Sequence, residues 1–324
     1  MSTNYQLEIV WKNVFLMVVY HLLALHGFYY MVSFRAFVAT TIWATIVGET
    51  SNLGVIPGAH RLWTHRTYKA KLPLRIFLML CNCIANQNSI YVWARDHRVH
   101  HKFTDTHADP HNINRGFFFA HMGWLLCRKH PDVIKKGKTV DMSDLENEDV
   151  VVFQRKYFRY LTFILSIFIP TVVPWYFWGE HLYVSFCLAT MFRYVVSLHA
   201  TWLVNSVAHL WGTKPYDGRI KPVENIIVSY ITHGEGWHNY HHTFPWDYKA
   251  AELDTYRGNT HTAFIDLMAK LGLAYDLKVA PKSMIQKCKS KNESRSQDFL
   301  KDIKEKEKQL IFVENGATRQ EILR

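Results

Sequence analysis

Nine of the 19 histidines in this 324-residue chain occur at spacings that favour a shared metal site. Histidines three or four residues apart project from one face of a helix, so a short group can direct several imidazoles toward one point. The pattern HxxHH occurs twice, and each copy can supply three imidazoles. The nine candidate ligands are His60, His65, His97, His100, His101, His209, His238, His241 and His242.

An all-imidazole donor set is neutral, and it suits iron, copper, zinc or nickel better than the metals that prefer oxygen ligands. Nine ligands exceed what one ion uses, so the set implies two ions. A structural zinc site closes with four ligands and usually includes cysteine, and no cysteine lies within these groups. A redox-active pair of iron ions fits best. We expect the other ten histidines to lie in apolar segments or to make ordinary hydrogen bonds.

The composition narrows the class of protein that positions these histidines. The low counts of glycine (15) and proline (10) exclude collagen-like and low-complexity chains, and 49% apolar residues exclude global disorder. Five cysteines without a CxxC pair do not make a disulfide framework. A mean hydropathy of −0.11 beside 15% aromatic residues indicates that apolar and polar segments are separated along the chain.

Four apolar segments are candidates for membrane helices: residues 14–32, 37–56, 160–177 and 183–204. Each approaches the length of about 20 residues that crosses a hydrocarbon core, and tryptophan and tyrosine cluster at their ends. The second segment is weaker because Glu49 and Asn52 lie inside it. The alternative is four buried helices of a soluble bundle. We predict an all-α integral membrane protein, with four transmembrane helices in two hairpins and a helical cytosolic catalytic cap.

Charge supports this arrangement. Of the 38 lysines and arginines, 16 lie in residues 57–156 and 18 after residue 204, whereas only Lys12 and Arg35 precede residue 57. The positive-inside rule therefore places the cap and both termini in the cytosol. The net charge of +11 would meet anionic membrane lipid or a polyanionic substrate. Nucleic acid is a poorer partner, because no nucleic-acid-binding motif accompanies the basic residues.

The predicted spans divide the chain into five parts. Residues 1–56 form the N-terminal segment and the first hairpin, 57–156 the cap with the first two histidine groups, and 157–204 the second hairpin. Residues 205–281 return to the cap with His209 and the third group. Residues 282–324 form a charged tail, either solvated or an exposed helix.

The histidine groups and the sequence around them resemble one known family. The segments HRLWTH, WARDHRVHHKF, DPHNINRGFFFAHMGWLLCRKHP, NSVAHLWG and GEGWHNYHHTFPWDY are similar to the membrane acyl-CoA desaturases, the stearoyl-CoA Δ9-desaturase family, and most of all to its insect members. The resemblance covers about residues 11–278. It implies a multi-pass enzyme of the endoplasmic reticulum membrane that uses O2 to insert a double bond, Δ9 by default, into a saturated fatty acyl-CoA. Two electrons would come from cytochrome b5 and NADH-cytochrome b5 reductase, as separate partners since no HPGG haem motif occurs.

The resemblance also implies roles for individual residues. One Fe2+ ion would be held by His60, His65, His97, His101 and His241, and the other by His100, His209, His238 and His242, with Asn205 reaching the second ion through water. The coenzyme A part of the substrate would meet Asn13, Asn88, Arg95, Asp96, Arg128, Lys129 and Trp202. The acyl chain would run in a buried tunnel bent beside the metals by Gln87, Trp93 and Thr201.

Two departures from the family bear on specificity. Relatives commonly have an aromatic residue where this chain has Gly48 and alanine where it has Asn52, near the closed end of the tunnel. These differences leave chain length and double-bond position open, including a desaturase of another regiospecificity such as Δ11. Two further alternatives are a membrane di-iron fatty acyl hydroxylase and a non-catalytic scaffold that binds lipid or metal.

Overall fold

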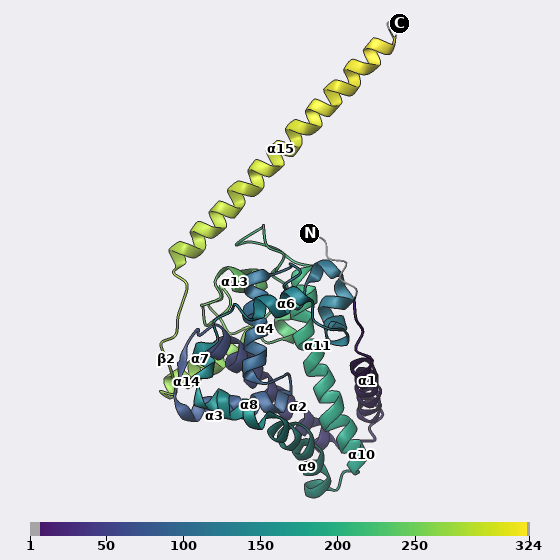
Figure 1. Cartoon of the computed structure of the whole chain (residues 1–324), viewed down its shortest axis with the longest axis vertical. Coiled ribbons are helices and arrows are strands. Elements are labelled where there is room, and N and C mark those ends of the chain that lie inside the picture. Colours follow the sequence, from purple (N-terminus) through teal and green to yellow (C-terminus); the bar gives the residue numbers. More distant parts are fainter. Residues whose placement is uncertain (1–6, 323–324) are drawn as a thin grey trace.

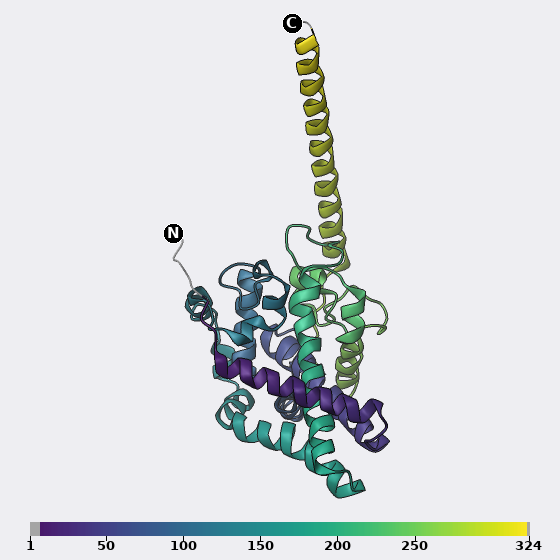
Figure 2. The ribbon, with the colours of Figure 1, turned by 90° about the vertical axis from the view of Figure 1, so that its right-hand side faces the viewer.

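The computed structural model describes residues 7–322, with side chains described as far as residue 306 except for residue 302. The described part is mostly helical, with loops between the helices and little sheet. Its sheet consists of β1 (Lys69–Ala70) and β2 (Ala274–Tyr275), which pair antiparallel. Figures 1 and 2 show a helical body from which a single long helix, α15 (Lys282–Ile322), extends. The charged tail is therefore an extended helix as far as the structure describes it.

Three helical runs in the described residues are long and apolar enough to cross a membrane. The first is α1 (Trp11–Val32), in which Ala24 and Gly27 are buried and all other residues are at least partly exposed, as contact with lipid along the helix requires. The other two runs join shorter helices end to end. The second contains α8 (Asp149–Thr162), η4 (Phe163–Phe168) and α9 (Ile169–Trp178), and the third contains α10 (Leu182–Ser185), η5 (Phe186–Phe192), α11 (Arg193–Ser206) and η6 (Val207–His209).

The remaining expected span is shorter than the other three. The helix α2 (Val38–Leu53) has 16 residues, and Glu49 and Asn52 reduce its apolar character. It continues directly into the π-helical segment η1 (Gly54–Thr64), where Pro57 cannot donate a backbone hydrogen bond. The carbonyl of Pro57 accepts a bond of 2.7 Å from the Tyr68 hydroxyl. The structure thus supports three spans by length and composition, and the four-span arrangement stays a prediction.

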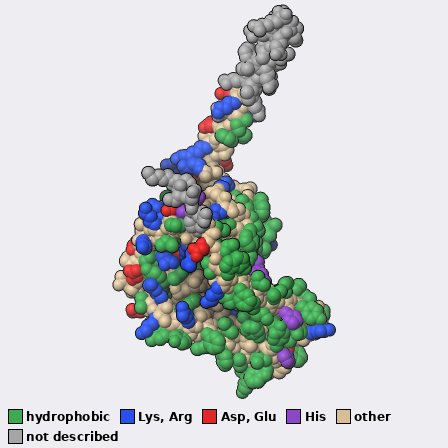
Figure 3. Space-filling model, turned by 45° about the vertical axis from the view of Figure 1, so that its right-hand side comes forward, with side chains coloured by type: hydrophobic (Ala, Val, Ile, Leu, Met, Phe, Trp, Pro, Cys, Tyr) green, Lys and Arg blue, Asp and Glu red, His purple; other side chains and the backbone are tan. Residues whose placement is uncertain are grey.

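Close backbone contacts pack the apolar helices together. A Cβ atom on Gly27 of α1 would lie 2.2 Å from the carbonyl oxygen of Cys187 on η5. A Cβ atom on Gly54 would lie 2.0 Å from the backbone nitrogen of Asn82 on α3 (Leu72–Ala85). Only glycine permits either approach. The space-filling view shows apolar side chains concentrated on the lower part of the body, where these long helices lie (Figure 3).

The rest of the body is made of shorter elements. These are α3, α4 (Ile90–Phe103), η2 (Ile113–Arg115), η3 (Phe119–Gly123), α5 (Trp124–Leu126), α6 (Pro131–Gly137), α7 (Ser143–Glu146), α12 (Ile226–Ile231), α13 (His238–Thr243) and α14 (Thr260–Lys270). Their main apolar core includes Leu74, Leu78 and Ile265. Buried Gln154 of α8 accepts a hydrogen bond from the backbone nitrogen of Ile90 (2.9 Å) and donates one to Asn82 (2.7 Å). This amide fixes the start of α4, which carries the second histidine group.

Candidate metal centre

The nine predicted histidines meet from four separate parts of the fold. They lie on η1 or just after it, on α4, at the end of η6 and on α13. Within each of two groups, the candidate ligand atoms lie within 4.8 Å of one another. One group is His60, His65, His97, His101 and His241, and the other is His100, His209, His238 and His242. The two groups have the same members as the two sets that the resemblance implied.

The spacing of the ring nitrogens in the first group suits a shared cation. The Nε2 atom of His241 lies 2.9 Å from that of His60 and 3.1 Å from that of His101. A neutral imidazole has one N–H and one lone pair, so the Nε2 atom of His241 cannot make a well-formed hydrogen bond to both of the other Nε2 atoms at once. Two nitrogens about 2.1 Å from one ion, at right angles, lie about 3.0 Å apart. The observed distances fit that geometry.

The second group repeats this arrangement. The Nε2 atom of His238 lies 3.1 Å from those of both His209 and His242. His238 and His242 are one helical turn apart on α13, so their rings lie on one face of that helix. The donor set in both groups therefore fits two ions that accept imidazole nitrogen.

Three carboxylates, of which Glu235 and Asp109 are buried and Asp105 is partly buried, face the outer nitrogens of the histidines. A carboxylate at Nδ1 fixes the ring orientation and leaves Nε2 for a metal, and it makes the ligand more basic. The carboxylates come from the turn before α13 and from the loop after α4. The distances from Nδ1 to the carboxylate oxygen are 2.9 Å for His60–Glu235, 2.9 Å for His100–Asp109 and 3.3 Å for His209–Asp105.

Sequence reasoning missed these carboxylates. Asp105 and Asp109 follow the α4 histidines closely, and Glu235 stands three positions before His238. Proximity to a histidine group was a usable signal, but it does not say which ring each carboxylate meets. Glu235 also pairs with Arg61 at 2.7 Å, and both side chains are buried.

The electrostatics favour neutral rings, as metal ligation requires. Burial, together with the repulsion of neighbouring imidazoles, holds the pKa well below its ordinary value in His65, His97, His101, His238, His241 and His242. His100 differs: burial opposes its protonation, but the adjacent Asp109 carboxylate raises its pKa. Although burial alone would raise it, the pKa of Glu235 is lowered by His60 and Arg61.

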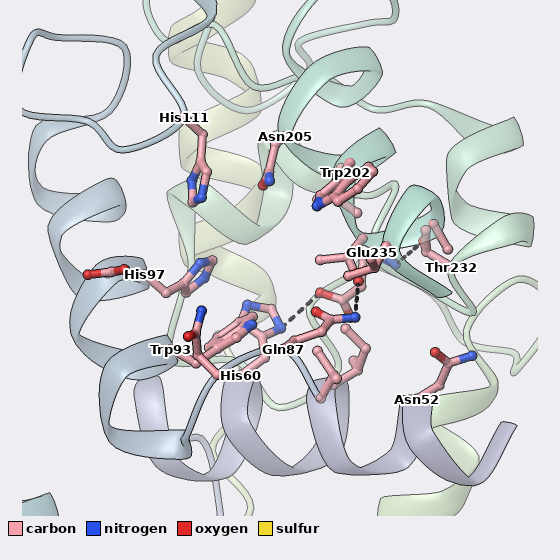
Figure 4. Close-up of a pocket in the computed structure, with 18 of the residues that line it drawn as sticks. Asn52, His60, Gln87, Trp93, His97, His111, Trp202, Asn205, Thr232 and Glu235 are labelled. Atoms are coloured by element: carbon pink, nitrogen blue, oxygen red, sulfur yellow. Dashed lines mark hydrogen bonds and ion pairs between the residues drawn. The ribbon is translucent and has the colours of Figure 1, made fainter. Parts of the chain in front are cut away.

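A cavity of about 270 Å³ opens beside the first group and reaches the second (Figure 4). His60, His97 and His238 line it. So do seven of the residues predicted to contact the substrate or the second ion: Gln87, Asn88, Trp93, Asp96, Thr201, Trp202 and Asn205.

Two contacts shape the cavity wall. The amide of Gln87 donates a hydrogen bond of 3.0 Å to the hydroxyl of Thr201, which ties the end of α3 to α11. The ring of Trp93 stacks on His97 with centroids 4.8 Å apart. Both contacts hold cavity-lining side chains in fixed positions.

The remaining predicted substrate residues lie beside the cavity or outside it. Arg95 and Lys129 both pair with Asp96, which lines the cavity. The two cations also line an adjoining hollow with Asp96. Arg128 lies outside the main cavity, and its exposed side chain pairs with Glu8 at 2.6 Å. Asn13 lies behind the wall, where its amide donates to the carbonyl of Leu125 at 2.8 Å.

Comparison with known proteins identifies the family. Residues 36–257 match the sequence model of the fatty acid desaturase family. An acyl-CoA Delta-9 desaturase from Acheta domesticus is 58% identical over 87% of this chain and 79% of its own length, and an acyl-CoA Delta12-desaturase from the same organism is 57% identical over 87% and 79%. The stearoyl-CoA desaturase of Homo sapiens is 54% identical over 86% of this chain and 77% of its own. These matches confirm the predicted resemblance, and the chain belongs to the fatty acid desaturase family of oxidoreductases.

Proposed function

We propose that this chain is an acyl-CoA desaturase that inserts a double bond into a fatty acyl-CoA. The observation that carries the proposal is the convergence of nine histidines beside a cavity. The chain's relatives are named as acyl-CoA desaturases, which specifies the reaction. In this reaction the acyl chain loses two hydrogens. Together with two electrons and two protons, they reduce one O2 to two waters. Two irons held by the two histidine groups would supply the oxidising power when bound.

The residues of the chain contribute orientation. The Gln87–Thr201 hydrogen bond and the Trp93 ring would hold the acyl chain in a fixed bend beside the histidines. A bound chain that presents the same C–H bonds in every encounter reacts faster and at one position. Asn205 lines the cavity next to the second group, and we assign it a water-mediated contact with that ion.

We place the coenzyme A moiety at the cavity mouth. Arg95 and Lys129 form a cationic pair around Asp96 there, and cations of this kind bind phosphate through charge-assisted hydrogen bonds. Asn88 and Trp202 on the cavity wall, together with Asn13 and Arg128 nearby, complete the proposed contacts.

We further propose that the chain crosses the endoplasmic reticulum membrane four times, with the cap and both termini on the cytosolic side. The scarcity of positive charge in the two hairpins supports this orientation. A cytosolic cap would receive electrons from cytochrome b5, itself reduced by NADH-cytochrome b5 reductase.

Regiospecificity is the least constrained part of the proposal. The two Acheta relatives are nearly equally similar to this chain, yet their names differ between Delta-9 and Delta12. Overall identity therefore does not assign the position, and local residues decide it. Asn52 lines the cavity, whereas a Cβ on Gly48 would lie 3.4 Å from the Arg193 side chain. We retain Δ9 as the default.

Expression in a desaturase-deficient yeast tests the proposal. Gas chromatography should detect a new monounsaturated fatty acid, and positional derivatisation should locate its double bond. His100→Ala should make none, whereas His107→Ala, outside the nine-histidine set, should behave as the parent. The proposal would be contradicted if the parent protein is present and supplied with electrons by cytochrome b5 but forms no alkene. Hydroxy-acyl products would favour a hydroxylase.

A further inference from the structure

A tight turn after α12 connects the cavity wall to the metal centre. The hydroxyl of Thr232 accepts a hydrogen bond from the backbone nitrogen of Glu235 (3.2 Å), which closes the turn. Thr232 and Glu235 both line the cavity, and Glu235 contacts His60 (Figure 4). Between these two residues, the side chain of His233 contacts another element, α2.

His233 joins this turn to α2. Its Nε2 atom lies 3.2 Å from the carboxylate of Glu49, and its Nδ1 atom lies 3.1 Å from the Thr260 hydroxyl. The side chains of Glu49 and His233 are 56% and 29% exposed, so the ion pair lies at the surface of the wall. Glu49 also interacts with Asn52, one helical turn further along α2. Both partners therefore adjoin residues that line the cavity.

The backbone of the turn is held in an unusual conformation. His233 has φ = 58°, in the left-handed region that non-glycine residues seldom adopt. At the next residue, Gly234, a Cβ atom would lie 2.5 Å from the Asn259 side chain. Such conformations persist where surrounding contacts fix them. The Glu49 carboxylate is one of those contacts, and it raises the pKa of His233, so the pair retains its charge at higher pH.

From outside the cavity, the ion pair connects two segments that form part of its wall. Asn52, Val55 and Ile56 line the cavity from α2 and η1, whereas Ile231 and Thr232 line it from α12 and the turn. In Figure 4, Asn52 and Thr232 lie on the side of the cavity away from His111. Loss of the Glu49–His233 contact would release the turn from α2 along this part of the wall.

We propose that Glu49 and His233 are positioning residues that clasp α2 to the turn and so fix the wall against which the acyl chain lies. This inference rests on the proposed function, since it concerns the same cavity. The clasp sets how tightly acyl chains of different length bind, and it leaves the metal centre intact.

Binding and turnover of purified, iron-loaded protein in nanodiscs test the clasp. The variants are His233→Asn, whose asparagine tolerates the left-handed backbone, Glu49→Gln, and the reversed pair Glu49→Lys with His233→Asp. The matched control is Asp276→Asn. Asp276 also has a left-handed backbone (φ = 55°) and an exposed ion pair, with Lys69 at 2.9 Å, but this pair lies at the small sheet, joining β1 to the residue after β2.

We expect the Kd for stearoyl-CoA to rise about two- to fivefold in His233→Asn and Glu49→Gln, as loss of a partly exposed ion pair permits. KM should rise in parallel, and the ratio of C16 to C18 products should change. The iron content and kcat should stay at the parent values, and the reversed pair should recover binding.

Two results would overturn the clasp: a Kd equal to that of Asp276→Asn, or weaker binding matched by an equal loss of iron, which indicates a merely structural role. A parent protein that binds stearoyl-CoA but forms no alkene contradicts the proposed function instead. The Kd comparison still decides the clasp in that case, because it needs no turnover.

Discussion

Two sets of histidines in this molecule use the same side chain in opposite ways. The metal-centre set is the nine histidines of the two groups, whose Nε2 atoms converge. The relay set is His21, His199 and His121, from α1, α11 and η3. His21 Nε2 lies 3.1 Å from His199 Nε2, and His199 Nδ1 lies 2.9 Å from His121 Nε2. The relay set is therefore a line of three rings, in which the central ring, His199, contacts one neighbour through each of its two nitrogens.

The difference lies in how the ring nitrogens are satisfied. In the relay set the outer ends meet the Met17 carbonyl (2.7 Å) and the Ser206 hydroxyl (3.0 Å), so one N–H per ring is enough to connect the line. In the metal-centre set, His241 Nε2 meets two other Nε2 atoms, and one proton cannot serve all three. Carboxylates at the outer nitrogens complete the contrast. Convergence with carboxylate support, rather than histidine number, distinguishes a metal site from a polar contact.

The largest expected effect comes from removing a converging ring. His241→Ala should lower desaturation at least about 100-fold, because it removes a ligand from the first group, and removing even a supporting partner of a metal ligand costs about 10- to 100-fold. The measurements are product formation by gas chromatography and iron per chain by elemental analysis. Full iron and activity in this variant would refute the assignment of His241 as a ligand.

The carboxylates are expected to have the next largest effect. Glu235→Gln should lower activity about 10- to 100-fold by loosening His60. It should also destabilise the protein by about 3–5 kcal/mol, because buried Arg61 loses its charged partner. Iron content and thermal unfolding in detergent would measure the two effects. Glu148→Gln is the control, since it breaks another ion pair (Arg75, 2.6 Å) away from the histidines; equal losses in both variants would contradict the supporting role of Glu235.

The same contrast explains which contacts of the site could be predicted from the sequence. The HxxHH spacing predicted convergence because it is local: one helix turn determines it. The carboxylate at His60 could not be assigned that way, since Glu235 is far from it in the sequence and reaches it through tertiary packing. Glu49 and Asn52 explained from the sequence why the second apolar segment is weak. The pairing of Glu49 with His233 could not be predicted from the sequence pattern.

A smaller effect is expected at the hydrogen bond between Gln87 and Thr201 on the cavity wall. Gln87→Ala should lower kcat/KM about two- to tenfold and broaden the distribution of double-bond positions, because one hydrogen bond to Thr201 is lost. Thr201→Val removes the same bond from the other side. Since the two residues share one interaction, the double variant should be little worse than either single variant. Additive losses would show that the two side chains act independently.

The smallest effect is expected in the relay set, and it tests the comparison most directly. His199→Gln removes the central ring and should lower the free energy of unfolding by about 1 kcal/mol, the net worth of a typical hydrogen bond. Activity and iron per chain should match those of the parent, because the partners of the His199 ring nitrogens among the described residues are the two neighbouring imidazoles. Loss of iron in His199→Gln would mean that a linear set of histidines also supports the metal centre. The distinction between converging and linear rings would then fail, since a line of hydrogen bonds would carry the effect that we assign to convergence.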